Sequence, residues 1–264
     1  MEQMQQNEII QQFQKLLEEN DRPQQARDFS QLMWLIDGME RQFDTVVKEL
    51  QEVKQQLAQV KDRQSPVKKA LTGMVRALEN KVAQARERLQ SVREKIVDGA
   101  AQAVEGFKRT GVAALDKTLS VLGVKRTLGL LQRDFSRLSK DTKATIQKVE
   151  SIGQELRSVG GHLKNAGRAA IGKDTKEIDG GQEGHFQAGL LAPLRVTQKL
   201  YAGLNNAALA AIGNVERLEE AAAAGRDQKK KPSIRKDLAE KQAQTAARPE
   251  PAPEAEKKPV EASL

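Results

Sequence analysis

The amino-acid sequence predicts an all-α protein built from elongated long-helix hairpins or a coiled coil, followed by a disordered C-terminal tail. Apolar residues recur at alternating steps of three and four over long stretches, the spacing that keeps them on one stripe of a helix. Aromatic residues make up only 3% of the 264-residue chain and charged residues 30%. This composition suits long helices with narrow apolar stripes better than a thick globular core.

Residues 1–64 are predicted to form an N-terminal helical hairpin whose second arm is the first coiled-coil helix. A first helix over residues 2–19 is followed by Asp21, the expected N-cap of the second helix, and by Pro23 in its first turn. Trp34 widens the apolar face of the second helix, so we expect the first helix to fold back and cover it.

The apolar seam of this second helix is the predicted coiled-coil interface. It contains ten positions without a polar interruption, and a stripe of this kind needs another helix to bury it. Its residues are Phe29, Leu32, Ile36, Met39, Phe43, Val46, Leu50, Val53, Leu57 and Val60.

Residues 65–172 are predicted to be a basic long-helix region with an elbow near residues 106–123. Ser65 and Pro66 have the chemistry of an N-cap and a first helical residue. In the helix that follows, we place Met74, Leu78 and Val82 on the seam, and the extra spacing predicts a stutter that locally unwinds a supercoil. A second long seam then runs through Leu128, Leu131, Phe135, Leu138, Thr142, Thr145, Val149, Ile152, Leu156, Val159, Leu163, Ala166 and Ala170.

The last third of the chain is predicted to contain three segments. A flexible loop covers residues 173–186, an Ala-rich helix covers residues 187–225, and a disordered tail of Lys, Pro, Ala and Glu covers residues 226–264. Within the tail, Ser233 can cap a short helix that places Ile234 and Leu238 on one face. This segment is either a peptide motif for a partner's groove or a solvated basic patch.

The net charge of +8 is unevenly distributed. Residues 1–65 contain 8 Lys and Arg against 12 Asp and Glu, whereas residues 66–173 contain 22 against 10. The acidic and basic parts either neutralise one another in a folded hairpin, which we favour, or provide a surface for nucleic acid or anionic lipid. The candidate nucleic-acid contacts, directed at phosphates without sequence preference, are Arg86, Arg88, Arg93, Lys95, Arg133, Arg137 and Lys140.

No constellation in the sequence predicts catalysis, a cofactor or a metal site. The chain has no cysteine and only two histidines, which are far apart in sequence. The string from Gly167 to Lys173 has the glycine and lysine spacing of a phosphate-binding loop, but Asp174 stands where that loop needs Ser or Thr. We therefore expect a protein that is not an enzyme.

The sequence favours a cytoplasmic protein. The N-terminus lacks the features of a signal peptide, and no window approaches 18 consecutive apolar residues. Basic residues do accompany Leu and Val between residues 156 and 173, but without the Trp or Phe anchors of interfacial helices, so membrane attachment is not favoured.

Four segments carry a resemblance to a helical family without assigned activity that is encoded on conjugative and other mobile elements of gut Firmicutes. They are Leu17–Phe43, Leu190–Arg195, Ala208–Arg226 and the Lys230–Leu238 part of the tail. The resemblance implies a bacterial cytoplasmic setting and an accessory role in transfer or maintenance of such an element, and it provides no catalytic residue.

The function predicted from the sequence is that of a non-enzymatic coiled-coil scaffold or accessory interaction protein. Its expected partner is another protein, or a second copy of the chain, bound through the coiled coil. The alternative is a nucleic-acid-binding accessory factor that uses the basic residues of 66–173.

Overall fold

The computed structural model describes residues 4–59, 66–112, 114–115, 123–170, 174 and 185–230, and the regular structure among them is helical. The prediction of an all-α protein is confirmed. The elements are η1 (Met4–Gln6), α1 (Glu8–Glu19), α2 (Pro23–Ala58), α3 (Pro66–Thr110), α5 (Val124–Ala170) and α6 (His185–Lys230).

The chain divides into two compact units, residues 1–223 and residues 224–264. Of the second unit, only the end of α6 belongs to the described residues. The predicted disordered tail beyond Lys230 and most of the loop predicted at 173–186 lie outside them.

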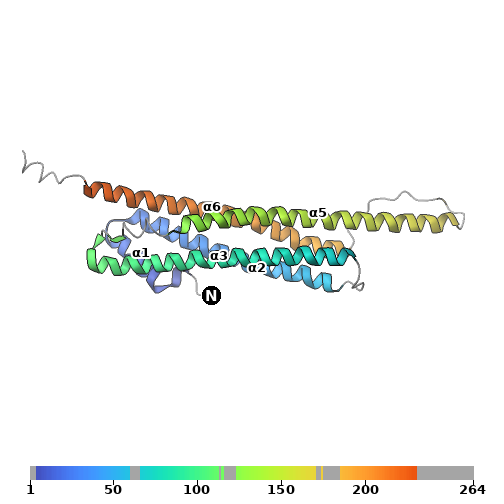
Figure 1. Ribbon diagram of the computed structural model, residues 1–264, viewed down its shortest axis with the longest axis horizontal. Helices are drawn as coiled ribbons and strands as arrows, with labels where there is room; N and C mark the ends of the chain where they lie inside the picture. The colour runs from blue at the N-terminus through green and yellow to red at the C-terminus, as the bar shows by residue number, and fades with distance from the viewer. Residues whose placement is uncertain are drawn as a thin grey trace, which may run out of the picture. The chain divides into compact units, whose positions relative to one another are not determined.

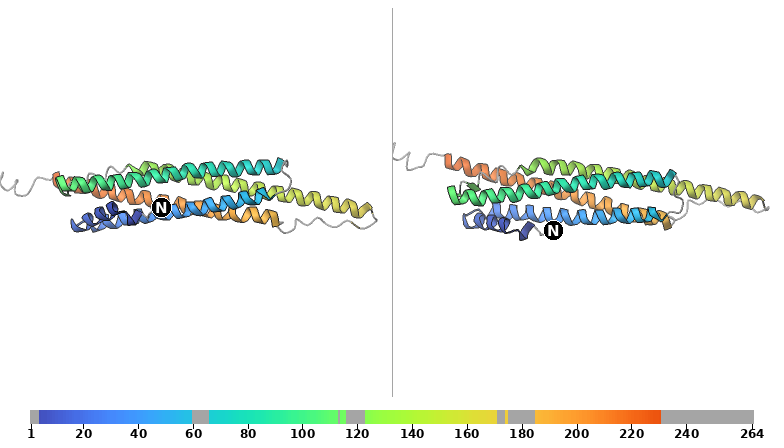
Figure 2. Two further views of the ribbon diagram at one scale, coloured as in Figure 1. Left: turned by 90° about the horizontal axis from the view of Figure 1, so that it is seen from below. Right: turned by 60° about the horizontal axis from the view of Figure 1, so that its bottom comes forward.

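Within the first unit, α2, α3, α5 and α6 form an antiparallel four-helix bundle with up-down-up-down connectivity (Figures 1 and 2). Each helix lies beside the next one in the chain, and α6 closes the arrangement by packing against α2. Antiparallel neighbours are the natural result when long helices follow one another through short connections.

Polar contacts between α3 and α5 repeat at intervals of one heptad. Lys81 bonds to Asp141 at 2.6 Å, Arg88 pairs with Asp134, and Lys95 donates to the hydroxyl of Thr127 at 2.9 Å. Because the partner numbers fall by seven as the α3 numbers rise by seven, the two helices keep one register over these turns.

The contact between α2 and α6 repeats every two heptads. Arg217 pairs with Asp28 at 2.9 Å, Gly203 lies against Gln42, and Gly189 lies against Gln56. A Cβ atom at either glycine would approach the facing glutamine to 3.1–3.3 Å. The glycines therefore leave room on α6 for the ends of these glutamine side chains.

Nine of the ten residues predicted to form the first seam are buried in the core of the bundle, from Phe29 to Leu57, and Val60 lies outside the described residues. They pack against helices of the same chain. Phe43, for example, meets Phe135 of α5 with ring centroids 5.6 Å apart. The bundle can therefore bury this seam without a second chain.

Helix α1 is a fifth, short helix that packs on both α2 and α3. Asn7 caps its start, because its side-chain oxygen accepts hydrogen bonds from the backbone of Ile9 and Ile10. The ring of Phe13 stands nearly perpendicular to that of Phe29 at a centroid distance of 4.9 Å.

The prediction that α1 covers Trp34 is wrong, because 61% of this side chain is exposed. Met33 and Ile36 fill the inner side of α2 at this level, and α1 and η1 contact the side that carries Phe29 and Asp37. Trp34 is two residues before Ile36, a rotation of about 200°, so its side chain lies on the outer face of α2.

The predicted stutter in α3 is also wrong. Val75, rather than Met74, is the buried residue between Leu71 and Leu78, so the alternation of four and three continues through Val82 without interruption. Met74 and Val75 are both apolar, so the sequence alone does not show which of them lies on the seam. Placing Met74 there predicts a stutter, and the burial of Val75 removes it.

The caps at the other helix boundaries depend on backbone conformation. Pro23 begins α2 as predicted, but the N-cap is Arg22, and Asp21 occupies the left-handed region with φ 58° in the connection from α1. At the end of α3, Gly111 has φ 66°, and its N–H donates to the carbonyl of Phe107. A glycine with positive φ directly after a helix is a common terminator.

Helix α6 begins at His185, two residues before the predicted boundary at residue 187, and Pro193 lies inside it. Proline in a helix interior removes one backbone hydrogen bond and is unfavourable by about 3 kcal/mol. Leu190 and Leu191, which precede the proline, are both buried in the core. Burial of two leucines offsets a penalty of this size, at about 1.5–3 kcal/mol for each side chain.

The α1–α2 contact gives a first prediction. Replacing Phe29→Ala removes a fully buried ring and its contact with Phe13, so we expect the free energy of unfolding to fall by about 3–5 kcal/mol. The matched control, Trp34→Ala, removes an exposed aromatic side chain of the same helix and should change it by no more than about 0.5 kcal/mol. Urea denaturation followed by circular dichroism measures both, and equal losses would contradict this assignment of inner and outer faces.

Candidate functional site

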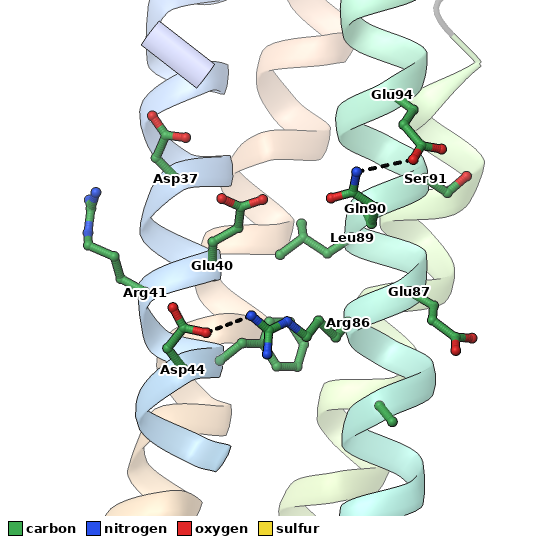
Figure 3. Close-up of a pocket in the computed structure, with 12 residues that line it drawn as sticks. Asp37, Glu40, Arg41, Asp44, Arg86, Glu87, Leu89, Gln90, Ser91 and Glu94 are labelled. Carbon is green, nitrogen blue, oxygen red and sulfur yellow. Dashed lines mark hydrogen bonds and ion pairs between the residues drawn. The ribbon is translucent and has the colours of Figure 1, made fainter. Parts of the chain in front are cut away.

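The candidate site is a groove between α2 and α3, with a volume of about 710 Å³ (Figure 3). Its walls are two antiparallel helices, lined by residues 37–44 of α2 and 83–94 of α3. Phe43 and Leu89, both buried, lie below it and belong to the core of the bundle. The groove is therefore a feature of the bundle's outer surface, with a floor of buried core side chains.

Carboxylates predominate among the charged residues that line this groove. Asp37, Glu40 and Asp44 come from α2, and Glu87 and Glu94 come from α3. The cations of the lining are Arg41 and Arg86. The groove is thus acidic, although α3 belongs to the basic part of the sequence.

The α2 carboxylates of the groove have structural partners. Asp37, which is buried, accepts a hydrogen bond from the backbone N–H of Met4 at 2.8 Å. Glu40 pairs with Arg93 at 3.1 Å, and Asp44 pairs with Arg86 at 2.8 Å, as the dashed line in Figure 3 marks. These carboxylates therefore tie the N-terminal segment and α3 to α2.

The α3 carboxylates of the groove differ from them. Glu87 and Glu94 are exposed, and Glu94 accepts a hydrogen bond from Gln90 at 3.1 Å. Neither forms an ion pair with another residue in the described part of the chain. Their charges are available to a group that enters the groove from solvent.

The structure separates the predicted nucleic-acid contacts into two sets. Those on α3 make polar contacts with neighbouring helices: Arg86 and Arg93 with α2, and Arg88 and Lys95 with α5. Within the bundle, Arg86 and Arg93 thus pair with carboxylates of α2, and Arg88 pairs with a carboxylate of α5. The pairs with α2 join the acidic and basic parts of the sequence, as the favoured alternative predicts, whereas Arg88 and Asp134 both belong to the basic part.

The second set lies on the outer face of α5. Arg133, Arg137 and Lys140 are exposed and follow one another at steps of four and three. Arg126 extends this stripe by one heptad at its N-terminal end. No ion pair of these four residues with another described residue is formed. They make a continuous basic stripe along the helix.

Tyr201 is the titratable group with the largest perturbation. Its ring is fully buried between α6 and the rest of the bundle, and burial, with a smaller contribution from Asp141, raises its pKa well above the usual range. Its hydroxyl, together with the buried side-chain oxygens of Gln42, Thr142 and Thr197, has no hydrogen-bond partner among the described residues. This group lies in the core and is not placed to act on a bound molecule.

Within the described ranges, the remaining titratable residues form no candidate metal site. In the described residues, no cluster of three or more His, Asp or Glu side chains could hold a metal ion. His162 is exposed, and the glycine–lysine string ends in residues outside the described ranges, as do Ser233, Ile234 and Leu238 of the tail. The pKa of Glu49 is raised by partial burial and by Glu52, on the outer part of α2.

The groove cannot be predicted from the sequence, because it depends on how two helices lie side by side. One signal was available: Asp37, Glu40 and Asp44 flank the seam of α2 at helical spacing, and Glu87 and Glu94 are one heptad apart in α3. Such residues are usually solvated helix faces. These carboxylates meet at one groove only because α2 and α3 pack antiparallel.

Over residues 6–259 the chain matches a group described as Family of unknown function (DUF6674). The chain belongs to this family. Comparison with curated proteins and with solved structures gives no match. Membership of DUF6674 agrees with the resemblance to a helical family without assigned activity, and it leaves the function to be argued from the groove and the basic stripe.

The DUF6674 chain has no helix, among those described, with the length and apolar character needed to span a membrane.

Tyr201 gives a second prediction. The variant Tyr201→Phe lacks a buried hydroxyl without a partner, so near neutral pH its free energy of unfolding should be within about 1 kcal/mol of the wild-type value, or higher. The pKa of Tyr201 is higher in the folded protein than in the unfolded protein, where it has the ordinary value of about 10. The resulting contribution to the free energy of unfolding is fully present below this ordinary value and is lost as the pH rises above it. Relative to the variant, the wild type should therefore lose up to about 1.4 kcal/mol per pH unit in that range.

Urea denaturation of both proteins at a series of alkaline pH values makes this comparison. The variant corrects for the lysines, which also titrate there. Identical pH dependence of the two proteins would contradict the burial of Tyr201, the single tyrosine of the chain.

Proposed function

We propose that this DUF6674 protein is a non-enzymatic scaffold or accessory interaction protein whose partners bind the outside of a self-contained helical bundle. One observation supports this above the others: the seam that looked available for a partner helix is buried by the chain's own helices. Recognition is then left to surface features, which here are an acidic groove and a basic stripe on different helices.

The resemblance to a family of mobile elements gives this proposal a setting. In that setting the protein would be cytoplasmic and would assist the transfer or maintenance of the element by holding other components together. A rigid bundle suits that role because it presents fixed surfaces without a large ordering cost on binding.

Affinity capture of the full-length protein from native cells, with and without nuclease, tests the proposal. We expect the same protein partner in both arms, because the interaction is between proteins. A variant with Glu87→Lys and Glu94→Lys shows whether the partner uses the groove. Absence of any reproducible protein partner, or conversion of a small molecule by the purified protein, would contradict the proposal.

A second candidate function is binding of nucleic acid through the basic stripe of α5, and the exposure of Arg133, Arg137 and Lys140 along one helix face favours it. Contacts of this kind would be made to phosphates and would carry no sequence preference. The α3 residues that pair within the bundle would not take part.

Salt dependence provides the prediction for this second candidate. If the stripe binds duplex DNA or RNA, replacing Arg133, Arg137 and Lys140 with Ala should reduce the slope of log affinity against log salt by about 0.9 for each lost phosphate contact on B-DNA. The matched control replaces Arg27, Lys48 and Lys69, which are exposed cations elsewhere on the bundle. Equal effects of the two triple variants, or no binding at low salt, would exclude the stripe.

A further inference from the structure

The α2/α3 groove continues a surface on which the chain itself already seats a helix. α1 packs on both α2 and α3, and η1 precedes it and packs on α2. The backbone N–H of Met4 in η1 bonds to Asp37, which also lines the start of the groove. The open part of the groove therefore begins where this N-terminal cover ends, and a helix entering it would lie in line with α1.

The dimensions of the groove suit a short helix. Its lining extends over residues 37–44 of α2 and 83–94 of α3. At about 1.5 Å per residue these stretches measure about 10–17 Å, which matches two to three turns of a guest helix. α1, with 12 residues, is a helix of comparable length on the adjoining surface.

The charge of the groove selects the kind of helix. Glu87 and Glu94 are one heptad apart on the α3 rim, exposed and without ion pairs in the described chain. A guest with Lys or Arg at the same spacing would pair with both carboxylates. An acidic segment or a nucleic acid would be repelled by them.

Trp34 adds a second, independent feature beside the groove. It precedes Asp37 by three residues and Arg41 by seven, so it lies on the same side of α2 as these groove residues, and it is 61% exposed. An exposed tryptophan provides apolar contact area and a ring face that attracts cations. Both properties favour a partner with apolar and basic side chains.

We propose that the α2/α3 groove, together with Trp34, binds a basic amphipathic helix of about 10–12 residues from a partner protein. This inference rests on the proposed function, since it specifies the partner that the scaffold would hold. The guest places apolar residues toward Ala83 in the groove and toward Trp34 beside the end of the groove, and its cations pair with Glu87 and Glu94. Arg41, on the opposite rim, leaves room for one acidic residue of the guest.

The test uses the full-length protein and two synthetic helical peptides. The first contains Leu at every third or fourth position with Lys and Ala elsewhere, and the second has Glu in place of every Lys. Neither peptide contains Trp, so the fluorescence of Trp34, the single tryptophan of the chain, reports on the protein alone. We expect the Lys peptide to bind, measured by anisotropy of a label on the peptide, and to shift the emission of Trp34, whereas the Glu peptide does neither.

Variants locate the binding site. Glu87→Lys with Glu94→Lys should weaken binding of the Lys peptide by roughly tenfold or more. The matched control, Glu18→Lys with Glu52→Lys, makes the same change of charge at exposed positions outside the groove and should weaken it far less. Circular dichroism of both variants verifies that they fold.

Failure of the Lys peptide to bind, equal binding of the Glu peptide, or equal weakening by the two variants would each overturn the inference. A protein partner captured equally well by wild type and by the groove variant would also overturn it, while the scaffold proposal itself would stand. If no protein partner is captured reproducibly even by the wild type, both the groove inference and the scaffold proposal are contradicted.

Discussion

The bundle depends on the register between neighbouring helices. Each long helix has one narrow apolar stripe. The polar contacts between α3 and α5 repeat by heptads, with 81, 88 and 95 against 141, 134 and 127. Between α2 and α6, positions 28, 42 and 56 face 217, 203 and 189, with an ion pair at the first and a glycine against a glutamine at the other two. A slip of one residue in any pair would break the whole row of contacts and rotate the stripe away from the core. This register determines the position of the groove and of the charged residues on the surface.

Charge that is segregated along the sequence becomes interleaved in space. Because α3 lies between α2 and α5, its cations alternate between Glu40 and Asp44 on one side and Asp134 and Asp141 on the other. Surface pairs of this kind contribute little to stability individually, about 0–1 kcal/mol each, and the pair of Arg93 with Glu40 is the most buried of them. Together the pairs occupy four cations of α3. What remains is a negative groove between α2 and α3 and a positive stripe on α5, two surfaces that suit partners of opposite charge.

The sequence predicted the helices, their proline-marked starts and nearly all of the first seam, because a repeat of three and four is a local property of one helix. A seam requires another helix but does not specify which one, so the packing of α5 and α6 around α2 could not be predicted. Trp34 is an example. Its apolar side chain suggested burial, but Met33 and Ile36 face the core, and this orientation of α2 leaves Trp34 on the outer face. The groove could not be predicted from the sequence for the same reason, because its two walls come from separate helices.

Helix α6 has the least regular stripe of the four, and its fixed position requires a further explanation. Large and small side chains alternate along it, with Tyr201 and Leu204 followed by Ala208 and Ala211, all fully buried. A shift by one heptad would bring the ring of Tyr201 to the place of Ala208, and forcing a ring into a space shaped for a methyl group destabilises a core by about 1–3 kcal/mol or more. The hydroxyls of Tyr201, Thr142 and Thr197 lack partners in the described core, each at a cost of about 1–3 kcal/mol. Side-chain shape in the core therefore adds to the ion pairs of Arg217 with Asp28 and of Arg195 with Glu150 in fixing α6 against α2 and α5.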